Sequence, residues 1–80
     1  MLADVLEHLV RGIVEHPDDV SVRDKQLRHG ALLEVRVHPS DLGKVIGRGG
    51  RTATAFRTVV KGLAGRDTAR IDFVDVDRRH

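Results

Sequence analysis

The sequence lacks cysteine, tryptophan and tyrosine, and Phe56 and Phe73 are its only large aromatic side chains. Without cysteine the chain has neither a disulfide framework nor thiolate metal ligands, and it suits a reducing compartment. No run of apolar residues is long enough to cross a bilayer. Acidic residues interrupt the apolar N-terminus at Asp4 and Glu7, so we expect no signal peptide. Both phenylalanines fit core positions, which argues against bases stacking on an aromatic platform.

The length of 80 residues allows one small domain. We expect a single domain over residues 1–80, with a core at about 18–76 and an N-terminal helix at about 2–16. A domain of this size buries only about 60–65% of the surface of its unfolded chain, so its stability should be modest.

The net charge of +2 is unevenly distributed along the chain. Residues 1–39 carry five basic and seven acidic side chains, a balance of −2. Residues 40–66 carry six basic and one acidic side chain, a balance of +5, and residues 67–80 return to −1. One basic segment in a chain of modest charge favours a polyanionic partner at one place, although a solvated helix face would give the same composition.

The strongest periodic signal lies at the N-terminus and predicts an amphipathic helix. Its apolar residues recur three or four positions apart: Leu2, Val5, Leu6, Leu9, Val10, Ile13 and Val14. Pro17 and the two aspartates after it end this helix. Alternating polar and apolar residues then predict strands at about 20–27, 33–37 and 69–73, with a hairpin turn at His29-Gly30.

Two helices are predicted between the second and third strands. Ser40 follows a proline and is the expected N-cap of the first, short helix. The next helix should end at Gly65 as its C-cap, and residues 75–80 should be frayed. Its inward-facing side chains should be Ala53, Phe56, Val59, Val60 and Leu63. The order is therefore α-β-β-α-α-β, an α+β fold in which helices cover a three-stranded sheet.

The loop between the two central helices, residues 47–50, reads Gly-Arg-Gly-Gly, a G-x-x-G tetrapeptide. Three glycines in four positions let another chain approach the backbone closely, and Lys44, Arg48 and Arg51 favour a negative chain. A P-loop spacing is absent, and Thr52 stands where the dinucleotide fingerprint needs its last glycine. Because G-x-x-G alone is also typical of a plain glycine-rich connector, the basic and apolar flanks carry the functional interpretation.

No group of residues typical of an enzyme is present. None of the five histidines pairs at the H-x-x-x-H spacing of a helical metal site. The candidate serine nucleophiles are Ser21 and Ser40, and Ser40 is better explained as a cap. The Glu-His pairs at 7–8 and 15–16 should mark the solvent side of the first helix. We therefore expect no catalytic residue, no metal site and no cofactor.

These features resemble the KH domains, which clamp about four nucleotides with a G-x-x-G loop. Residues 33–47 and 51–60 are similar to the small single-KH-domain proteins of bacteria, the KhpA family, and the element order is that of the type II KH fold. The resemblance implies a cytoplasmic, non-catalytic RNA-binding protein active in post-transcriptional regulation or as an RNA chaperone. Such proteins are also linked to cell shape and cell-wall biogenesis. The chain departs from the common pattern at Gly49 and Ala53, where bulkier residues are usual.

Residues and resemblance together predict a single-stranded RNA site around the loop. Backbone N–H groups of the loop and the start of the following helix would meet phosphate oxygens, with arginines adding charge-assisted contacts. Bases would lie in a groove between the two central helices and the strand that ends at Val37. The predicted site comprises Lys44, Val45, Ile46, Gly47, Arg48, Gly49, Gly50, Arg51, Ala53 and Arg57. Of the adjacent Val45 and Ile46, one should face the groove and one the core.

The sequence leaves the ligand and the partners open. A loop that clamps the backbone has no evident means of demanding a 2′-hydroxyl, so RNA is favoured over DNA by the resemblance alone. The resemblance also implies a homodimer, or a heterodimer with a larger KH-containing protein of the KhpB/Jag type, through the first helix or the outer helix faces. The alternative is a KH-shaped protein-interaction module that acts mainly by dimerisation. Neither a membrane nor a small-molecule substrate is expected.

Overall fold

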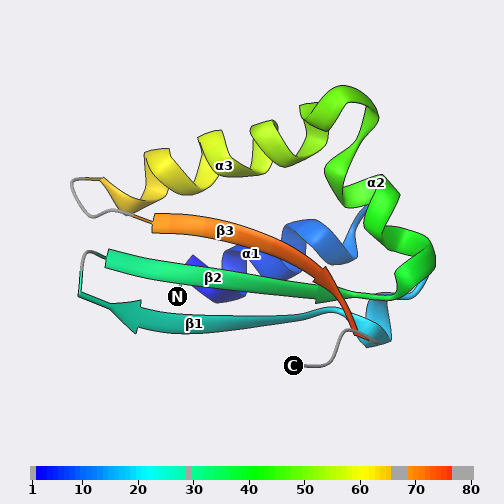
Figure 1. The fold of residues 1–80 in the computed structure, drawn as a ribbon, viewed down its shortest axis with the longest axis horizontal. Coiled ribbons are helices and arrows are strands. Elements are labelled where there is room, and N and C mark those ends of the chain that lie inside the picture. Colours follow the sequence, from blue (N-terminus) through cyan, green and yellow to red (C-terminus); the bar gives the residue numbers. More distant parts are fainter. Residues whose placement is uncertain (1, 29, 66–68, 77–80) are drawn as a thin grey trace.

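The computed structural model describes residues 2–28, 30–65 and 69–76. Figure 1 shows the helices and strands in the order α1 (Leu2–Arg11), β1 (Ser21–Leu27), β2 (Gly30–Val37), α2 (Leu42–Ile46), α3 (Arg51–Ala64) and β3 (Ala69–Asp75). Short 3-10 turns precede β1, α2 and α3: η1 (Pro17–Asp19), η2 (Pro39–Asp41) and η3 (Arg48–Gly50). The predicted α+β fold and its α-β-β-α-α-β order are confirmed.

The three strands form a mixed sheet in the order β1-β2-β3. β2 pairs antiparallel with β1 across a hairpin and parallel with β3, and α2 and α3 form the crossover that a parallel pair requires. In this register Val35 lies opposite Val22 on β1 and Phe73 on β3. The central strand therefore has both of its edges paired, and β3 forms one edge of the sheet.

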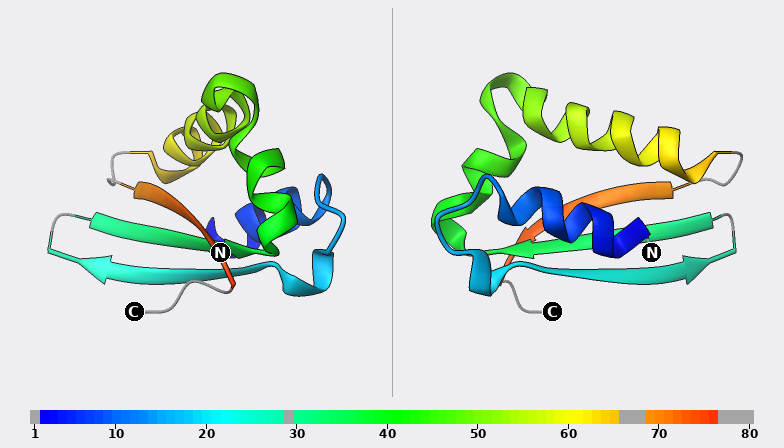
Figure 2. Two further views of the ribbon diagram at one scale, coloured as in Figure 1. Left: turned by 45° about the vertical axis from the view of Figure 1, so that its right-hand side comes forward. Right: turned by 180° about the vertical axis from the view of Figure 1, so that it is seen from behind.

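One face of the sheet carries the hydrophobic core, and the helices cover that face (Figures 1 and 2). Leu33, Val35 and Val37 alternate along β2 and are all completely buried. The helices, β3 and the residue before β1 add the rest of the core cluster: Leu6, Val10, Val20, Val45, Phe56, Val60 and Ile71. Among the described helices, none has the length and apolar character needed to cross a membrane.

Helix α1 is shorter than the apolar stripe predicts, because it ends at Arg11 rather than near residue 16. The N–H groups of Gly12 and Ile13 donate to carbonyls only three residues back, at 3.2 and 3.1 Å, which tightens the last turn. Glycine next to this turn favours termination of the helix. The chain that follows, including Glu15 and His16, is therefore free to fold against η2 instead of continuing the helix.

Five of the twelve apolar side chains predicted to face inward are exposed. A single row on each long helix reaches the sheet, namely Leu6 and Val10 on α1 and Phe56 and Val60 on α3. The outward residues are 37–57% exposed: Val5, Leu9, Ile13, Val59 and Leu63. A three-stranded sheet is too narrow to cover the full apolar width of both helices.

The predictions for the C-cap of α3, the hairpin turn and the C-terminal segment have different outcomes. Gly65 is the C-cap of α3, as predicted. Gly30, predicted to lie in the hairpin turn, begins β2 and pairs with Leu27, and His29, the other residue of the predicted turn, lies outside the described residues. Asp75 ends β3 and the Val76 N–H donates to Val37 at 2.8 Å, so regular structure extends past the start of the predicted frayed segment. Residues 77–80 lie outside the described part.

Candidate nucleic-acid interface

The glycine loop joins α2 to α3 and contains three residues with positive φ. The φ angles are 78° at Gly47, 64° at Gly49 and 77° at Gly50, a region that glycine adopts without the steric cost of a β-carbon. The Gly47 N–H donates to the Gly43 carbonyl at 2.8 Å, and the Gly50 N–H donates to Gly47 at 3.1 Å. These two bonds close the end of α2 and fold the loop into a tight turn ahead of α3.

The loop backbone is open to another molecule at Gly49 and Gly50 but is packed against α3 at Gly47. A β-carbon at Gly47 would collide with Thr52 in the first turn of α3, so this glycine packs against the helix. A β-carbon at Gly49 or Gly50 would meet no atom within 4 Å. The accessible part of the turn is therefore the Gly49-Gly50 backbone.

Helix α3 begins directly behind this open backbone and has no side-chain cap. Its N-cap is Gly50, and its first turn contains no acidic residue. The positive end of the helix dipole is therefore opposed by no acidic side chain of the first turn and remains available to an anion. Arg48 and Arg51 are exposed, and neither forms an ion pair with any carboxylate of the described chain.

The apolar residues of the predicted site separate into buried and exposed positions. Val45 is completely buried and Ala53 is 2% exposed, so both belong to the core beneath the loop. Ile46, next to Val45, is 38% exposed at the surface. This division matches the expectation that one of the adjacent pair faces the core, and it leaves Ile46 as the apolar side chain within reach of a ligand.

The strand beside the helices differs from the one predicted to line the groove. The strand that ends at Val37 is β2, which lies in the centre of the sheet with both edges paired. Helices α2 and α3 both pack against β3, the edge strand. The Arg57 guanidinium on α3 lies 5.7 Å from the centre of the Phe73 ring on β3, a cation–π distance. Any groove between the helices and a free strand edge is therefore bounded by β3.

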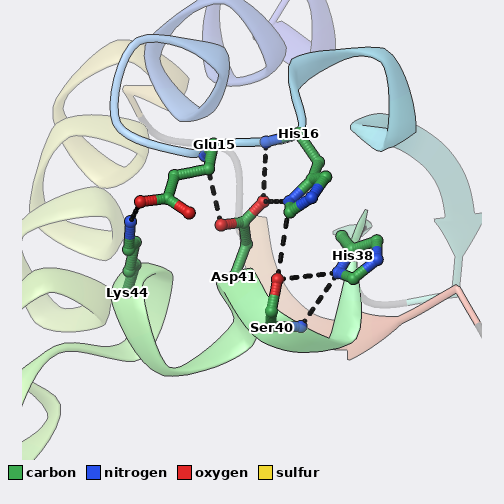
Figure 3. A network of polar contacts seen from close by, with 6 residues as sticks. All are labelled: Glu15, His16, His38, Ser40, Asp41 and Lys44. Carbon is green, nitrogen blue, oxygen red and sulfur yellow. Dashed lines mark hydrogen bonds and ion pairs between the residues drawn. The ribbon is translucent and has the colours of Figure 1, made fainter.

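Lys44 forms an ion pair with the segment between α1 and β1. Its Nζ lies 2.8 Å from a carboxylate oxygen of Glu15 (Figure 3). The hydrogen bond and the charge of Lys44 hold the pKa of Glu15 below its ordinary value. Both side chains are largely exposed, so the pair is weak and an external anion can compete for the lysine.

Asp41 is a polar residue that the sequence reasoning missed. It is completely buried, and its carboxylate accepts hydrogen bonds from the backbone N–H groups of Glu15 at 3.1 Å and His16 at 2.9 Å (Figure 3). Burial alone would raise the pKa of Asp41, but these bonds and His16 outweigh it and lower the pKa. Its only signal in the sequence was its isolation, as the one acid in the basic segment 40–66.

The expected role of Ser40 as an N-cap is wrong, because the N-cap of α2 is Asp41 and the N-cap of η2, the turn before it, is His38. The Ser40 N–H donates to Nδ1 of His38 at 3.0 Å, and Ser40 itself lies inside η2. Pro39 occupies the first position of that turn, which moves the cap one residue before the proline. Ser40 Oγ also lies 2.8 Å from the same ring nitrogen.

A family model described as KhpA/KhpB, KH domain, matches residues 3–76. The RNA-binding protein KhpA of Streptomyces coelicolor is 65% identical over 77 residues, covering 96% of each chain. The chain belongs to the KhpA family. KhpA of Mycobacterium tuberculosis is 60% identical over 98% of this chain and 96% of its own length, and KhpA of Halalkalibacterium halodurans is 44% identical over 89% and 96%.

Membership of the KhpA family agrees with the fold and with the chemistry of the site. The helices, the mixed sheet and the loop between α2 and α3 are those of a type II KH domain. The family is non-catalytic, which confirms the expectation that the chain is not an enzyme. Among the described residues, no group of three His, Cys, Asp or Glu side chains could hold a metal ion.

Proposed function

We propose that the protein binds single-stranded RNA and clamps its backbone with the loop Gly47-Arg48-Gly49-Gly50. The observation that carries the proposal is the open, positive-φ backbone at the uncapped start of α3, with an unpaired arginine on each side. The relatives are named RNA-binding proteins, which supports RNA as the ligand. The family resemblance further supports a cytoplasmic role in post-transcriptional regulation or RNA chaperoning, with a link to cell shape and cell-wall biogenesis.

In this proposal the phosphates meet the loop and the bases meet the groove beside it. The backbone N–H of Gly49 donates to one phosphate, and the helix dipole of α3 favours the same charge. Arg48 and Arg51 add charge-assisted hydrogen bonds to its neighbours. Ile46 offers an apolar contact to a base, and Arg57 on the β3 side extends the positive track.

Such a site is small, so binding by one domain is weak and depends only moderately on salt. Two or three phosphate contacts, at about 0.7 each on a single strand, give a slope of log K against log salt between about −1.4 and −2.1. Because the loop contacts the backbone, selectivity among base sequences is low. A steep salt dependence would require a larger basic surface than residues 44–57 supply.

The experiment that tests the proposal is fluorescence anisotropy of short single-stranded RNA, and of DNA of the same sequence, titrated with the protein. Arg48→Glu should weaken binding at least about tenfold, because one phosphate contact is replaced by repulsion. Arg23→Glu is the matched control, since it changes the net charge equally on strand β1. Equal loss in both variants would show a general charge effect and contradict the loop as the site, and the RNA-to-DNA ratio decides the ligand class.

A second candidate function, dimerisation through the helices, is favoured by their exposed apolar residues. Val5 and Leu9 on α1 and Val59 and Leu63 on α3 face away from the core. Apolar side chains grouped on a surface are typical of interaction sites. The partner is a second copy or a larger KhpB/Jag-type protein, whose KH domain the same family model covers. Two linked clamps would raise the effective affinity for a longer RNA without new contacts.

A further inference from the structure

A second group of polar contacts fastens the segment between α1 and β1 to the start of α2 (Figure 3). Its centre is Asp41, whose two oxygens accept from Glu15 and His16, residues 26 and 25 positions earlier in the chain. His16 also places its Nδ1 3.1 Å from Asp41 Oδ2. A buried carboxylate that holds two successive N–H groups fixes the relative position of the two segments. Asp41, His16 and Glu15 make no contact with RNA in the binding mode proposed above.

The rings of His16 and His38 lie stacked in this group, with their centroids 3.9 Å apart and their planes 14° apart. Their hydrogen bonds require different protonation at Nδ1. His38 Nδ1 accepts the Ser40 N–H, and a backbone N–H can only donate, so this nitrogen carries no proton. His16 Nδ1 faces a carboxylate oxygen and therefore carries one.

The two histidines therefore respond differently to acid. A charged His16 still donates to Asp41 and gains attraction to its carboxylate. A charged His38 carries a proton at Nδ1, which can donate to Ser40 Oγ at 2.8 Å but no longer accepts the Ser40 N–H. When both rings are charged, the stack also places like charges in contact. Proton uptake at His38 thus opposes the cap of η2.

Other charged groups near the stack do not cancel this effect. Glu15 is paired with Lys44, so the two contribute little net charge. Asp18 and Asp19 lie on η1, which packs against β2, but they are exposed and form no hydrogen bond or ion pair with either ring within the described chain. At the end of β3, Asp75 lies opposite Val37, the residue before His38. These carboxylates favour positive charge in general, and within the described chain the acceptor of the Ser40 N–H is Nδ1 of His38, not Glu15, Asp18 or Asp19.

This group of contacts is joined to the glycine loop by helix α2. Only α2, Leu42–Ile46, separates Asp41 from Gly47, and five residues of helix span about 7.5 Å. The far end of α2 holds the loop through the bond from Gly47 N–H to Gly43 O. A shift of η2 therefore moves α2, and with it the Gly49-Gly50 backbone relative to α3.

We propose that Asp41 and His38 are positioning residues of the RNA clamp, and that proton uptake at His38 Nδ1 releases η2 and weakens RNA binding. The name "latch" is used for Asp41, His16, Ser40 and His38. This inference rests on the proposed RNA-binding function for its consequence. The predicted movement of the glycine loop does not depend on that function and can be measured without RNA.

The test compares three histidine variants at about pH 7.5 and about pH 5.5, on either side of the ordinary titration range of histidine. His38→Asn keeps an acceptor for Ser40, since asparagine is a good N-cap, but it cannot take up a proton. His38→Ala removes the acceptor at both pH values. His8→Asn is the control, because His8 is an exposed histidine on α1. The readouts are the dissociation constant for a short single-stranded RNA and the amide chemical shifts of the loop glycines without RNA.

Protonation of all histidines adds positive charge, so the decisive quantity is the ratio of the dissociation constants at acid and neutral pH. We expect this ratio to be at least about fivefold larger in the wild type and in His8→Asn than in His38→Asn, the lower end of typical coupling between sites. The amides of Gly49 and Gly50 should titrate in the wild type and stay fixed in His38→Asn. His38→Ala should bind weakly at both pH values while circular dichroism shows an intact fold.

Two results would overturn the inference: loop amides that titrate alike in the wild type and in His38→Asn, or wild-type affinity in folded His38→Ala. If His38→Ala does not fold, the comparison of the wild type with His38→Asn decides the test. Loop amides that titrate as expected in a protein that binds no RNA at either pH would instead refute the proposed function and leave the latch in place.

Discussion

Gly47 lies so close to Thr52 that a β-carbon on it would come within 2.7 Å of the Thr52 β-carbon and 2.8 Å of its backbone nitrogen. The three loop glycines share a positive φ, but only Gly47 also lacks the space for a side chain. Gly49 and Gly50 are constrained by φ alone. The motif therefore combines one glycine that packs the loop against α3 with two that keep the backbone open.

This difference predicts unequal effects of alanine on stability. Gly47→Ala should lower the free energy of unfolding by about 2–6 kcal/mol, because backbone strain of about 1–3 kcal/mol adds to overpacking of similar size. Gly49→Ala should cost only about 1 kcal/mol, the cost of a left-handed conformation. Urea unfolding followed by circular dichroism measures both. Equal losses would contradict the packing of Gly47 against Thr52.

Gly49→Asp should abolish RNA binding without unfolding the protein. Aspartate tolerates the left-handed region, and no atom lies within 4 Å of the new β-carbon. Its carboxylate would stand where the proposal places a phosphate, so we expect a loss of at least about tenfold in affinity. Gly62→Asp is the matched control, since Gly62 is an exposed glycine of α3 with equally open surroundings. Undiminished binding by Gly49→Asp would place the RNA elsewhere.

In the proposed clamp Glu15 competes with RNA for Lys44, so Glu15→Gln should strengthen binding. The ion pair is short, at 2.8 Å, but exposed, so the expected gain is modest, about two- to fivefold. A released Lys44 would also steepen the salt slope by about 0.7. Glu7→Gln removes the same charge from a pair with Arg11 on α1 and controls for net charge. An equal gain in both variants would show that the effect is not specific to Lys44.

The lowered pKa of Asp41 predicts a specific acid sensitivity. A folded pKa below the ordinary value of 3.8 means that the charged carboxylate stabilises the fold above that pH. This contribution is lost as the pH falls from about 3.8 through the lower folded pKa. Asp41→Asn should therefore be less stable at neutral pH and lose less stability between neutral and acid pH than the wild type. Asp19→Asn, an exposed change, should behave as the wild type in the same urea titrations.

The sequence sufficed for the fold and the loop because their signals are local. Alternation along residues 33–37 and the glycines at 47–50 each act within a few neighbours, and both predictions agree with the structure. The register of the sheet was less accessible, since pairing β2 with β3 depends on a crossover of about thirty residues. The sequence therefore named the strand at 33–37 as the neighbour of the two central helices, whereas α2 and α3 pack against β3.

The latch could not be read from periodicity, because its contacts join residues about 25 positions apart. The apolar stripe from Leu2 to Val14 predicted a helix through Glu15 and His16. In such a helix their N–H groups would bond to helix carbonyls, so the sequence offered no reason to expect that they donate to Asp41. The same stripe overstated burial on α1. Amphipathic patterns show which side chains are apolar but not how many of them the sheet can cover.

The exposed apolar residues of α3 predict the surface through which the protein forms a dimer. Leu63 is 57% exposed and Val59, one turn earlier on α3, is 42% exposed. A charge at Leu63 would be buried without a partner in any interface on this face, so Leu63→Glu should shift a dimer to monomer in sedimentation experiments. Leu27→Glu is the control, because Leu27 is 53% exposed but lies at the end of β1, beside the hairpin.

Loss of the dimer should spare the clamp itself. A Leu63→Glu monomer should bind a short RNA as the wild type does, while its affinity for an RNA that spans two domains falls, because two linked sites become independent. A dimer that survives Leu63→Glu but is lost in Leu9→Glu would move the interface to α1. If the wild type is a monomer at every concentration, the exposed apolar residues of α3 would instead contact a different protein. The weak RNA binding of a single domain would then be strengthened only in the complex with that partner.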